Sequence, residues 1–305
     1  MIKKNNVVII FGPTGVGKTD LSIGIAEQLD SEIFSCDSRQ VYKELNIGVA
    51  KPNDLQLQKV KHHFIDHVSI HDHYSISKYE TEVIEKLKDY FSHKEIALFC
   101  GGSGLYIDAI CDGVDEMPDH DEEIRSQVIK MHEDYGIEAL RFELKKIDPQ
   151  YYSKVDLRNP QRIMRALEIY KITGKPFSEF RKNNPIERDF NIVKIGINID
   201  RNILYNRINQ RVEEMVNMGL IEEAREMHKY KGIVALKTIG YRELFDYFEN
   251  KTGKKEAIEL IKRNTRHYAR RQLTWFRRYN DVQWFSPDQK ENILLYINSI
   301  KNNVC

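Results

Sequence analysis

The chain has 305 residues, of which 41% are hydrophobic and 30% are charged. This length allows one large domain or two smaller ones with a sizeable buried core, and the composition excludes a disordered chain. Because 47 basic side chains stand against 46 acidic ones, the formal charge is only +1. The overall charge therefore gives no indication of a nucleic-acid partner, and any such indication must come from local clusters.

The sequence has no pattern typical of export or of a membrane protein. Its first apolar run, Val7–Phe11, is too short for the core of a secretory signal. No segment approaches the ~20 apolar residues that a membrane-spanning helix needs. No C-x-x-C pair occurs, which fits a reducing compartment, and we expect a cytoplasmic protein. The four cysteines are Cys36, Cys100, Cys111 and Cys305.

Short apolar runs alternate with helical patterns in the first third of the chain. Val7–Phe11 has the pattern of a strand that is buried on both faces of a parallel sheet, and a helix is predicted after it from Lys18 to Leu29. The next predicted elements are strands at Ser31–Cys36 and Glu95–Cys100, with a helix at Tyr79–Phe91 between them. This alternation predicts a doubly wound α/β core with a parallel sheet.

The pattern changes near Pro118. Charged helical segments follow at Asp121–His132 and Pro160–Tyr170, without a buried strand, and Phe190–Ile199 then has the pattern of a strand that returns to the sheet. We therefore predict a discontinuous α/β core at residues 1–116 and 190–305. Residues 117–189 are predicted to form a helical insertion domain.

One segment fits the phosphate-binding pattern G-x-x-x-x-G-K-[ST] and lies between the first strand and the first helix, as its chemistry requires. It consists of Gly12, Pro13, Thr14, Gly15, Val16, Gly17, Lys18 and Thr19. Its backbone N–H groups and the helix N-terminus can bind an anion, Lys18 can neutralise a terminal phosphate, and the Thr19 hydroxyl can bind Mg²⁺. A chance match on a glycine-rich turn is the alternative. The order of strand, loop and helix favours a P-loop NTPase-like fold that binds a di- or triphosphate.

Asp37 is the acidic residue nearest to the predicted phosphate site. Kinases and hydrolases of this fold usually have an Asp for Mg²⁺ at a strand end, but the strand that ends at Cys100 is followed by Gly101–Gly104 without a carboxylate. Asp37 follows the second strand. Because the carboxyl ends of parallel strands share one crevice, Asp37 should face the P-loop. It could be a metal ligand, a general base or an N-cap of the following segment.

Taken together, these segments resemble the bacterial tRNA dimethylallyltransferases, also called tRNA isopentenyltransferases. The resemblance extends along nearly the whole chain and is far more specific than a P-loop alone. One departure is Ser103, where the family more often has Thr, although a hydroxyl is retained. The matching segments are Gly12–Thr19, Asp37–Tyr42, Ala50–Pro52, Gly101–Tyr106, Arg158–Arg162, Arg165–Glu168, Thr238–Tyr241 and Thr274–Phe276.

The resemblance implies attack of N6 of an adenosine on C1 of dimethylallyl diphosphate, with release of pyrophosphate. The adenosine is the one 3′ of the anticodon in tRNAs that read codons beginning with U. Lys18 and Mg²⁺ on Thr19 would stabilise the leaving diphosphate, and Asp37 would accept the proton from N6. Arg211 lies on the predicted helix Ile203–Met218, and the resemblance assigns it a diphosphate contact. An Arg at this position is otherwise more often a solvated surface residue.

The resemblance also implies contacts to the tRNA anticodon stem-loop, and the helical insertion would serve them. The implied contact residues are Asp37, Ser38, Arg39, Gln40, Ser103, Arg125, Gln161, Arg162, Ile163, Met164 and Arg165. A basic cluster lies between Leu260 and Asn280, with seven basic and no acidic side chains. Such a cluster indicates phosphate contacts, but an ordinary solvated basic helix has the same pattern. The seven are Lys262, Arg263, Arg266, Arg270, Arg271, Arg277 and Arg278.

Three other functions remain open from the residues. A P-loop small-molecule kinase is weakened by the missing strand-end Asp, and a non-catalytic RNA-binding protein by the intact Lys18, Thr19 and Asp37. An adenylate isopentenyltransferase would use the same chemistry on free nucleotides. A zinc site in the histidine cluster is disfavoured, because extended residues four apart lie ~13 Å from each other. These histidines are His62, His63, His67, His71 and His73. We expect a monomer.

Overall fold

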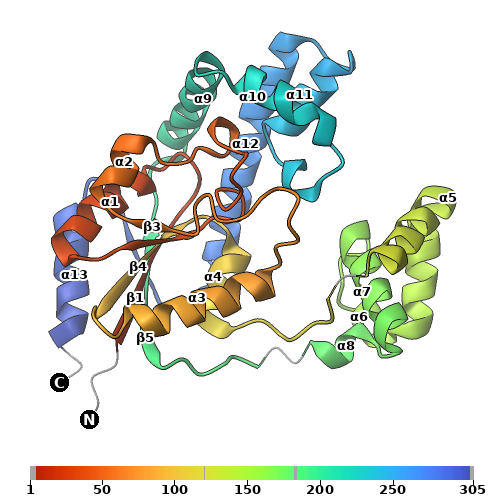
Figure 1. Cartoon of the computed structure of the whole chain (residues 1–305), viewed down its shortest axis with the longest axis horizontal. Helices are drawn as coiled ribbons and strands as arrows, with labels where there is room; N and C mark the ends of the chain where they lie inside the picture. Colours follow the sequence, from red (N-terminus) through yellow and green to blue (C-terminus); the bar gives the residue numbers. More distant parts are fainter. Residues whose placement is uncertain (1–4, 120, 182–183, 303–305) are drawn as a thin grey trace. The chain divides into compact units, whose positions relative to one another are not determined.

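The computed structural model of the chain describes residues 5–119, 121–181 and 184–302 (Figure 1). Cys305 lies outside the described residues. The chain packs into two compact units. We call the part up to Cys111 and from Glu187 onward the core unit, and Asp112–Ile186 the helical unit. No helix of the described residues is long and apolar enough to cross a membrane.

The core unit is built on a six-stranded sheet in which all paired strands are parallel. The strand order is β3-β2-β4-β1-β5-β6. The bounds are β1 Asn5–Phe11, β2 Ile33–Cys36, β3 His62–His63, β4 Ile96–Gly101, β5 Phe190–Ile197 and β6 Val282–Phe285. The predicted strands therefore all form, while β3 and β6 are short edge strands that the apolar pattern did not reveal.

Helices cover both faces of this sheet because successive residues of a buried strand point to opposite sides. Val8 and Ile10 of β1 pack in one core cluster with residues of α1 and α13, and Val7 and Ile9 pack in another with residues of α3 and α4. The fold is thus α/β and doubly wound, as predicted. The helices of the core unit are α1 Lys18–Leu29, α2 Asp54–Lys59, α3 Ile76–Tyr90, α4 Gly104–Asp112, α9 Arg201–Asn217, α10 Leu220–Met227, α11 Tyr241–Phe248, α12 Lys254–Phe276 and α13 Lys290–Asn302.

The helical unit has its own hydrophobic core, in which Val128, Leu140 and Leu144 pack against Ile163 and Leu167. Its helices are α5 Glu122–Ile147, α6 Pro149–Tyr152, α7 Pro160–Thr173 and α8 Phe177–Phe180. The sequence predicted a helix only as far as His132, but α5 continues to Ile147 across a kink. The kink is at Gly136, whose φ of 74° is readily accessible only to glycine.

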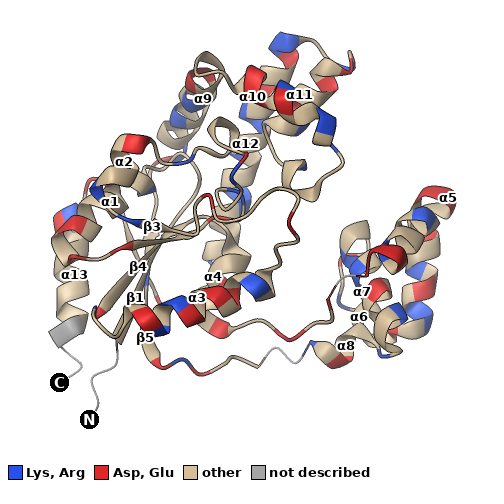
Figure 2. Ribbon diagram, viewed as in Figure 1, with Lys and Arg blue, Asp and Glu red and all other residues tan. Residues whose placement is uncertain are grey.

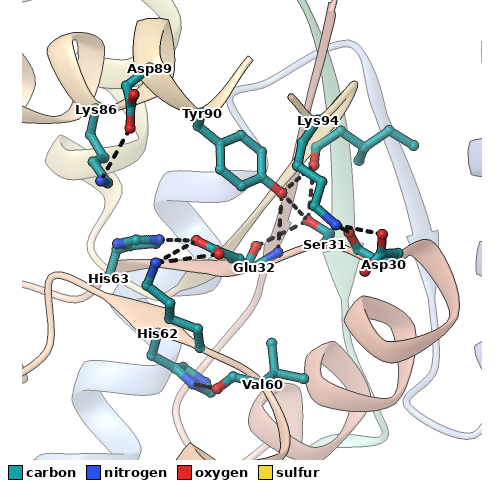
Figure 3. Close-up of polar contacts among 12 residues, drawn as sticks. Asp30, Ser31, Glu32, Val60, His62, His63, Lys86, Asp89, Tyr90 and Lys94 are labelled. Atoms are coloured by element: carbon teal, nitrogen blue, oxygen red, sulfur yellow. Dashed lines mark hydrogen bonds and ion pairs between the residues drawn. The ribbon is translucent and has the colours of Figure 1, made fainter. Parts of the chain in front are cut away.

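A polar network holds the edge of the sheet where β2 and β4 begin (Figure 3). We call Ser31, Glu32, His63 and Tyr90 the strand-start network. The Tyr90 hydroxyl donates to Ile96 O at 2.9 Å and accepts from Glu32 N at 3.1 Å, while the Ser31 hydroxyl donates to Ile96 O at 3.0 Å. His63 Nε2 lies 2.5 Å from the Glu32 carboxylate. Each of these side chains has a partner, so this edge is closed by hydrogen bonds.

Candidate active site

The opposite edge of the sheet, where the strands end, is shaped by glycines. β4 lies between β1 and β2, so the P-loop after β1 and Asp37 after β2 are separated by one strand. β4 ends at Gly101 and is followed by Gly102. A Cβ atom at Gly101 would lie 2.4 Å from Cys36 O, and one at Gly102 would lie 2.3 Å from Gln272 Nε2. Because neither position has room for a side chain, the three loops can approach one another closely.

The P-loop has the backbone that its glycines permit. Gly15 and Gly17 have φ values of 81° and 102°, in the left-handed region that glycine adopts without strain. Lys18 opens α1 and turns back over the loop, where its Nζ donates to Gly12 O at 3.0 Å and to Pro13 O at 2.9 Å. The amine is therefore held at the centre of the loop, where a bound phosphate would meet it.

The predicted reactive side chains line one cavity of about 410 Å³ in the core unit. Lys18, Thr19 and Arg211 line it together with Asp37. Another part of its wall is apolar and consists of residues of α9 and of the segments from α10 to α12. Residues of that part include Ile208, Val212, Met215, Leu220, Ile239 and Ile261. The cavity can therefore hold a ligand that carries both a phosphate group and an apolar group.

A second cavity, of about 340 Å³, adjoins the same cations. Lys18, Thr19 and Arg211 line both cavities, whereas Gly15 and Gly17 line only the second. The three side chains therefore lie where ligands in either cavity can contact them. Oxygen donors on these walls, such as the Thr19 hydroxyl and the Asp37 carboxylate, are of the kind that Mg²⁺ prefers.

The charged groups of the cavity are poorly solvated. Burial lowers the pKa of Lys18, with the nearby Arg211 guanidinium adding to the effect and Asp37 opposing it. Burial likewise lowers the pKa of Arg211, and the Asp37 carboxylate opposes this shift. Among the described residues, neither cation forms an ion pair with a carboxylate. An anionic ligand would therefore find two desolvated positive charges that no described carboxylate holds in an ion pair.

Asp37 uses one of its two oxygens to hold its own loop. Oδ1 accepts hydrogen bonds from Arg39 N at 2.8 Å and from Gln40 N at 3.3 Å. These bonds close the turn that follows Asp37, so the residue caps a turn and not a helix. Oδ2 has no hydrogen-bond partner among the described residues of the protein. Capping by Oδ1 is therefore compatible with Oδ2 acting on a ligand.

Ser103, which follows β4, holds the Asp37 loop through hydrogen bonds to Ser38. Its hydroxyl accepts from Ser38 N at 2.9 Å and donates to Ser38 Oγ at 3.1 Å, and Ser103 itself is buried. The side-chain NH₂ group of Gln40 donates to the carbonyls of Val49 and Ala50, at 3.3 and 2.9 Å. Arg39 also lines the cavity. Of the predicted tRNA contacts, Ser103 after β4 and Gln40 in the Asp37 loop thus already have structural partners.

Sequence inspection missed Gln272, which joins two of the loops. Its Oε1 accepts from Thr14 N at 2.9 Å and its Nε2 donates to Gly102 O at 2.8 Å. Tyr268 and Arg271, on the same helix α12, line the cavity as well. Burial and the charge of Asp37 raise the pKa of Tyr268 to about 12. The available signal in the sequence was a neutral Gln within the basic run Arg270–Arg278.

The remaining predicted contact residues belong to the helical unit. Arg125 and Arg165 both pair with the buried Glu168, at 3.7 and 3.3 Å, and Arg165 also donates to Pro118 O at 2.7 Å. Gln161 and Arg162 are exposed at the start of α7. Ile163 and Met164 are buried in the core of this unit, so their side chains pack the helix and do not face solvent.

Figure 2 shows basic residues on α12 and α9, and also on other helices such as α3 and α5. The charge of the α12 segment is partly neutralised. Lys262 pairs with Glu213 and Glu259, and Arg278 pairs with Asp108. Arg266 donates to Asn209 Oδ1. The exposed basic residues of the segment without an ion pair among the described residues are Arg263, Arg270, Arg271 and Arg277.

The histidines of the cluster contact separate partners and do not surround one common point. His63 contacts Glu32, His67 Nε2 lies 2.7 Å from Glu82, and His62 Nδ1 lies 2.8 Å from Val60 O. His71 packs edge-on against the ring of Tyr230. No group of three or more metal-ligating side chains is present in the described part of the chain.

A parallel, doubly wound sheet with a phosphate-binding loop after its first strand defines a P-loop NTPase-like protein. The family model for IPP transferase matches residues 40–279. The chain therefore belongs to the IPP transferase family, and the resemblance inferred from its motifs is confirmed.

Full-length relatives agree with this assignment. The chain is 48% identical to the tRNA dimethylallyltransferase of Christiangramia forsetii, over 97% of this chain and 98% of the relative. It is 45% identical to tRNA dimethylallyltransferase 1 of Bacteroides fragilis, over 95% and 97%. The structure is similar to the full-length tRNA isopentenylpyrophosphate transferase from Bacillus halodurans, with a TM-score of 0.72, 34% identity and coverage of 99% and 98%.

Proposed function

We propose that this enzyme transfers a dimethylallyl group from dimethylallyl diphosphate to N6 of the adenosine 3′ of the anticodon in tRNA, with release of pyrophosphate. The observation that carries the proposal is the single cavity that Lys18, Thr19 and Arg211 share with Asp37. Cations suit a diphosphate, and a carboxylate suits the proton of an amine. Membership of the IPP transferase family, and relatives named tRNA dimethylallyltransferase, support the choice of substrates.

The leaving group needs the most help, because an exocyclic aromatic amine is a weak nucleophile. When the C1–O bond breaks, both electrons pass to the diphosphate. Lys18 and Arg211 would stabilise that growing charge, and their lowered pKa values reflect burial in a site where such interactions are strong. Thr19 would hold a Mg²⁺ ion, whose chemistry is to neutralise further charge on the departing pyrophosphate.

Asp37 would act on the nucleophile. As the N6–C1 bond forms, N6 loses one proton, and Oδ2 of Asp37 would accept it. A positioned base of this kind typically contributes ~10² to 10⁴ in rate. The bonds from Arg39 N and Gln40 N to Oδ1 support this role, because they fix the carboxylate in one orientation.

The tRNA would have to present its adenosine outside the base stack, as enzymes that modify a base require. The exposed arginines of α12 that form no ion pair with the described residues would contact phosphates, and Arg271 and Arg39 would do so at the cavity itself. In the helical unit, Gln161 and Arg162 have exposed side chains for this task. Arg125 and Arg165 would contribute together with Glu168, and Ile163 and Met164 by packing α7.

The test is to incubate the purified protein with Mg²⁺, radiolabelled dimethylallyl diphosphate and unmodified tRNA, with AMP and ATP as parallel acceptors. We expect label in tRNA alone. A matched tRNA with inosine in place of the adenosine 3′ of the anticodon lacks the N6 amine and should remain unlabelled. Label in AMP or ATP would instead identify an adenylate isopentenyltransferase, and phosphate transfer from ATP without prenylation would identify a kinase.

A further inference from the structure

One wall of the cavity is a short segment without a regular partner in the sheet. We call Asn46–Ala50 the pocket loop; it contains the 3₁₀ helix η1 (Ile47–Val49). Gly48, Val49 and Ala50 line the cavity together with Asp37. Asn46 caps η1 without a side-chain hydrogen bond, so the first N–H groups of the loop need acceptors from elsewhere.

Glu223, in the first turn of α10, supplies those acceptors. Its Oε2 accepts from Ile47 N at 2.7 Å and from Asn46 N at 3.2 Å, and its Oε1 accepts from Gly48 N at 2.9 Å. Oε1 also accepts from the Tyr241 hydroxyl at 2.6 Å. One carboxylate therefore holds three successive N–H groups of the pocket loop, with bonds of the strong, charge-assisted kind.

Tyr241 fixes the loop by shape as well as by its hydroxyl. Its ring is fully buried, and a Cβ atom at position 48 would lie 2.6 Å from it, so only glycine fits there. Burial and the adjacent Glu223 carboxylate raise the pKa of Tyr241, which keeps its hydroxyl protonated as a donor. The pocket loop therefore packs closely against Tyr241 of α11, while Glu223 binds its backbone N–H groups.

The other end of the pocket loop is tied to the loop of the proposed base. Gln40 Nε2 donates to the carbonyls of Val49 and Ala50, and Gln40 N donates to Asp37 Oδ1. A continuous series of hydrogen bonds therefore runs from Glu223 through the pocket loop and Gln40 to Asp37. Glu223 is not among the described residues that line the cavity, so it would act on a ligand through residues that do, and this series leads to Asp37.

We infer that Glu223 is a positioning residue for the transfer reaction, which holds the pocket loop so that Gln40 keeps Asp37 in its reactive orientation. The inference rests on the proposed function, since it assumes that Asp37 accepts the N6 proton. It predicts an effect on kcat that exceeds the effect on the KM for dimethylallyl diphosphate, because the cations Lys18 and Arg211 lie on other elements. A misplacement of about 1 Å at a reacting group can cost up to ~10²-fold in rate.

The test compares Glu223→Gln with Glu222→Gln, the exposed neighbour on the same helix, in steady-state prenyl transfer to tRNA. Glutamine keeps the size of the side chain but directs an NH₂ group at N–H donors. We expect kcat of Glu223→Gln to fall by about tenfold or more, with the KM for dimethylallyl diphosphate within about twofold. Tyr241→Phe, which removes one of the four bonds, should lose about threefold, and Glu222→Gln should behave as wild type.

A double-mutant cycle with Gln40→Ala separates positioning from general destabilisation. If both residues act through the pocket loop, the double variant should lose little more than the worse single variant. Equal kcat for Glu223→Gln and wild type, or fully additive losses, would overturn the inference. If Glu223→Gln does not fold, Tyr241→Phe decides: unchanged kcat would contradict the inference and a selective loss of kcat would support it. Failure of wild type to label tRNA would instead refute the proposed function.

Discussion

Polar side chains differ between the edge of the parallel sheet where the strands begin and the edge where they end. At the edge where the strands begin, hydrogen bonds join Ser31, Glu32, His63 and Tyr90 to one another and to the starts of β2 and β4 (Figure 3). At the edge where the strands end, Lys18 and Arg211 are desolvated and have no carboxylate partner among the described residues. The first edge therefore contributes stability, while the second leaves charges available for a ligand and is less stable for it.

The largest expected effect comes from Asp37. Asp37→Asn keeps an oxygen that can accept from Arg39 N and Gln40 N but removes the base, so transfer should fall by ~10² to 10⁴. Asp37→Ala removes both and should also disturb the loop. Single-turnover transfer, together with tRNA binding measured by filter retention, checks this. Near-normal turnover by the Asn variant would exclude Asp37 as the base.

Loss of one cation should come next. Arg211→Ala removes a desolvated charge from the diphosphate site and should lower kcat by about 10²-fold or more, as for other groups that stabilise a leaving anion. Arg201→Ala, at the exposed start of the same helix α9, is the matched control and should have no such effect. Steady-state kinetics with dimethylallyl diphosphate measure both. Comparable losses in the two variants would mean that the role of Arg211 is not specific.

The strand-start network should respond in stability and not in chemistry. Tyr90→Phe leaves Glu32 N and the Ile96 carbonyl with fewer partners in a buried setting, and should cost about 1–3 kcal/mol of unfolding free energy. Tyr135→Phe, at a residue 74% exposed, is the control. Urea unfolding gives the difference, and kcat of the folded variant should be unchanged. A drop in kcat without a loss of stability would contradict the division between the two edges.

The smallest expected effect is a pH dependence of stability from the same network. Burial lowers the pKa of His63 below the usual 6.5, against the raising effect of Glu32. As the pH falls below about 6.5, the unfolded chain therefore binds a proton more readily than the folded one, and stability declines. His63→Gln should reduce the slope of Tm between pH 7.5 and 5.5, whereas His93→Gln, at an exposed position, should leave it unchanged. Equal slopes in wild type and His63→Gln would refute this.

Much of the fold was predictable because its signals are local. The apolar run of β1, the glycines of the P-loop and the helix from Lys18 follow one another within a few turns of chain, and all formed as expected. Short edge strands such as β3 and β6 were missed, since two to four residues carry too little periodicity. The helix end predicted at His132 lies close to Gly136, where the backbone of α5 is non-helical, and the helical segment after that glycine was not predicted.

The site was predictable in its members but not in its construction. A motif nominates Lys18, Thr19 and Asp37, yet nothing local shows that β4 lies between their strands and ends in glycines that let their loops meet. Ile163 and Met164 were nominated by the same resemblance as Gln161 and Arg162, and only packing separates the buried pair from the exposed one.

By itself, then, the sequence determined the phosphate-binding loop, the alternation of strands and helices, and the family, since each depends on residues close together in the chain or on an ordered set of motifs. The tertiary structure alone decided which oxygen of Asp37 is engaged, that Gln272 joins Thr14 to Gly102, and that Glu223 holds the pocket loop. Those contacts join residues as much as 258 positions apart. Hydrogen bonds of this kind depend on distances of about 3 Å, which only the packed chain establishes.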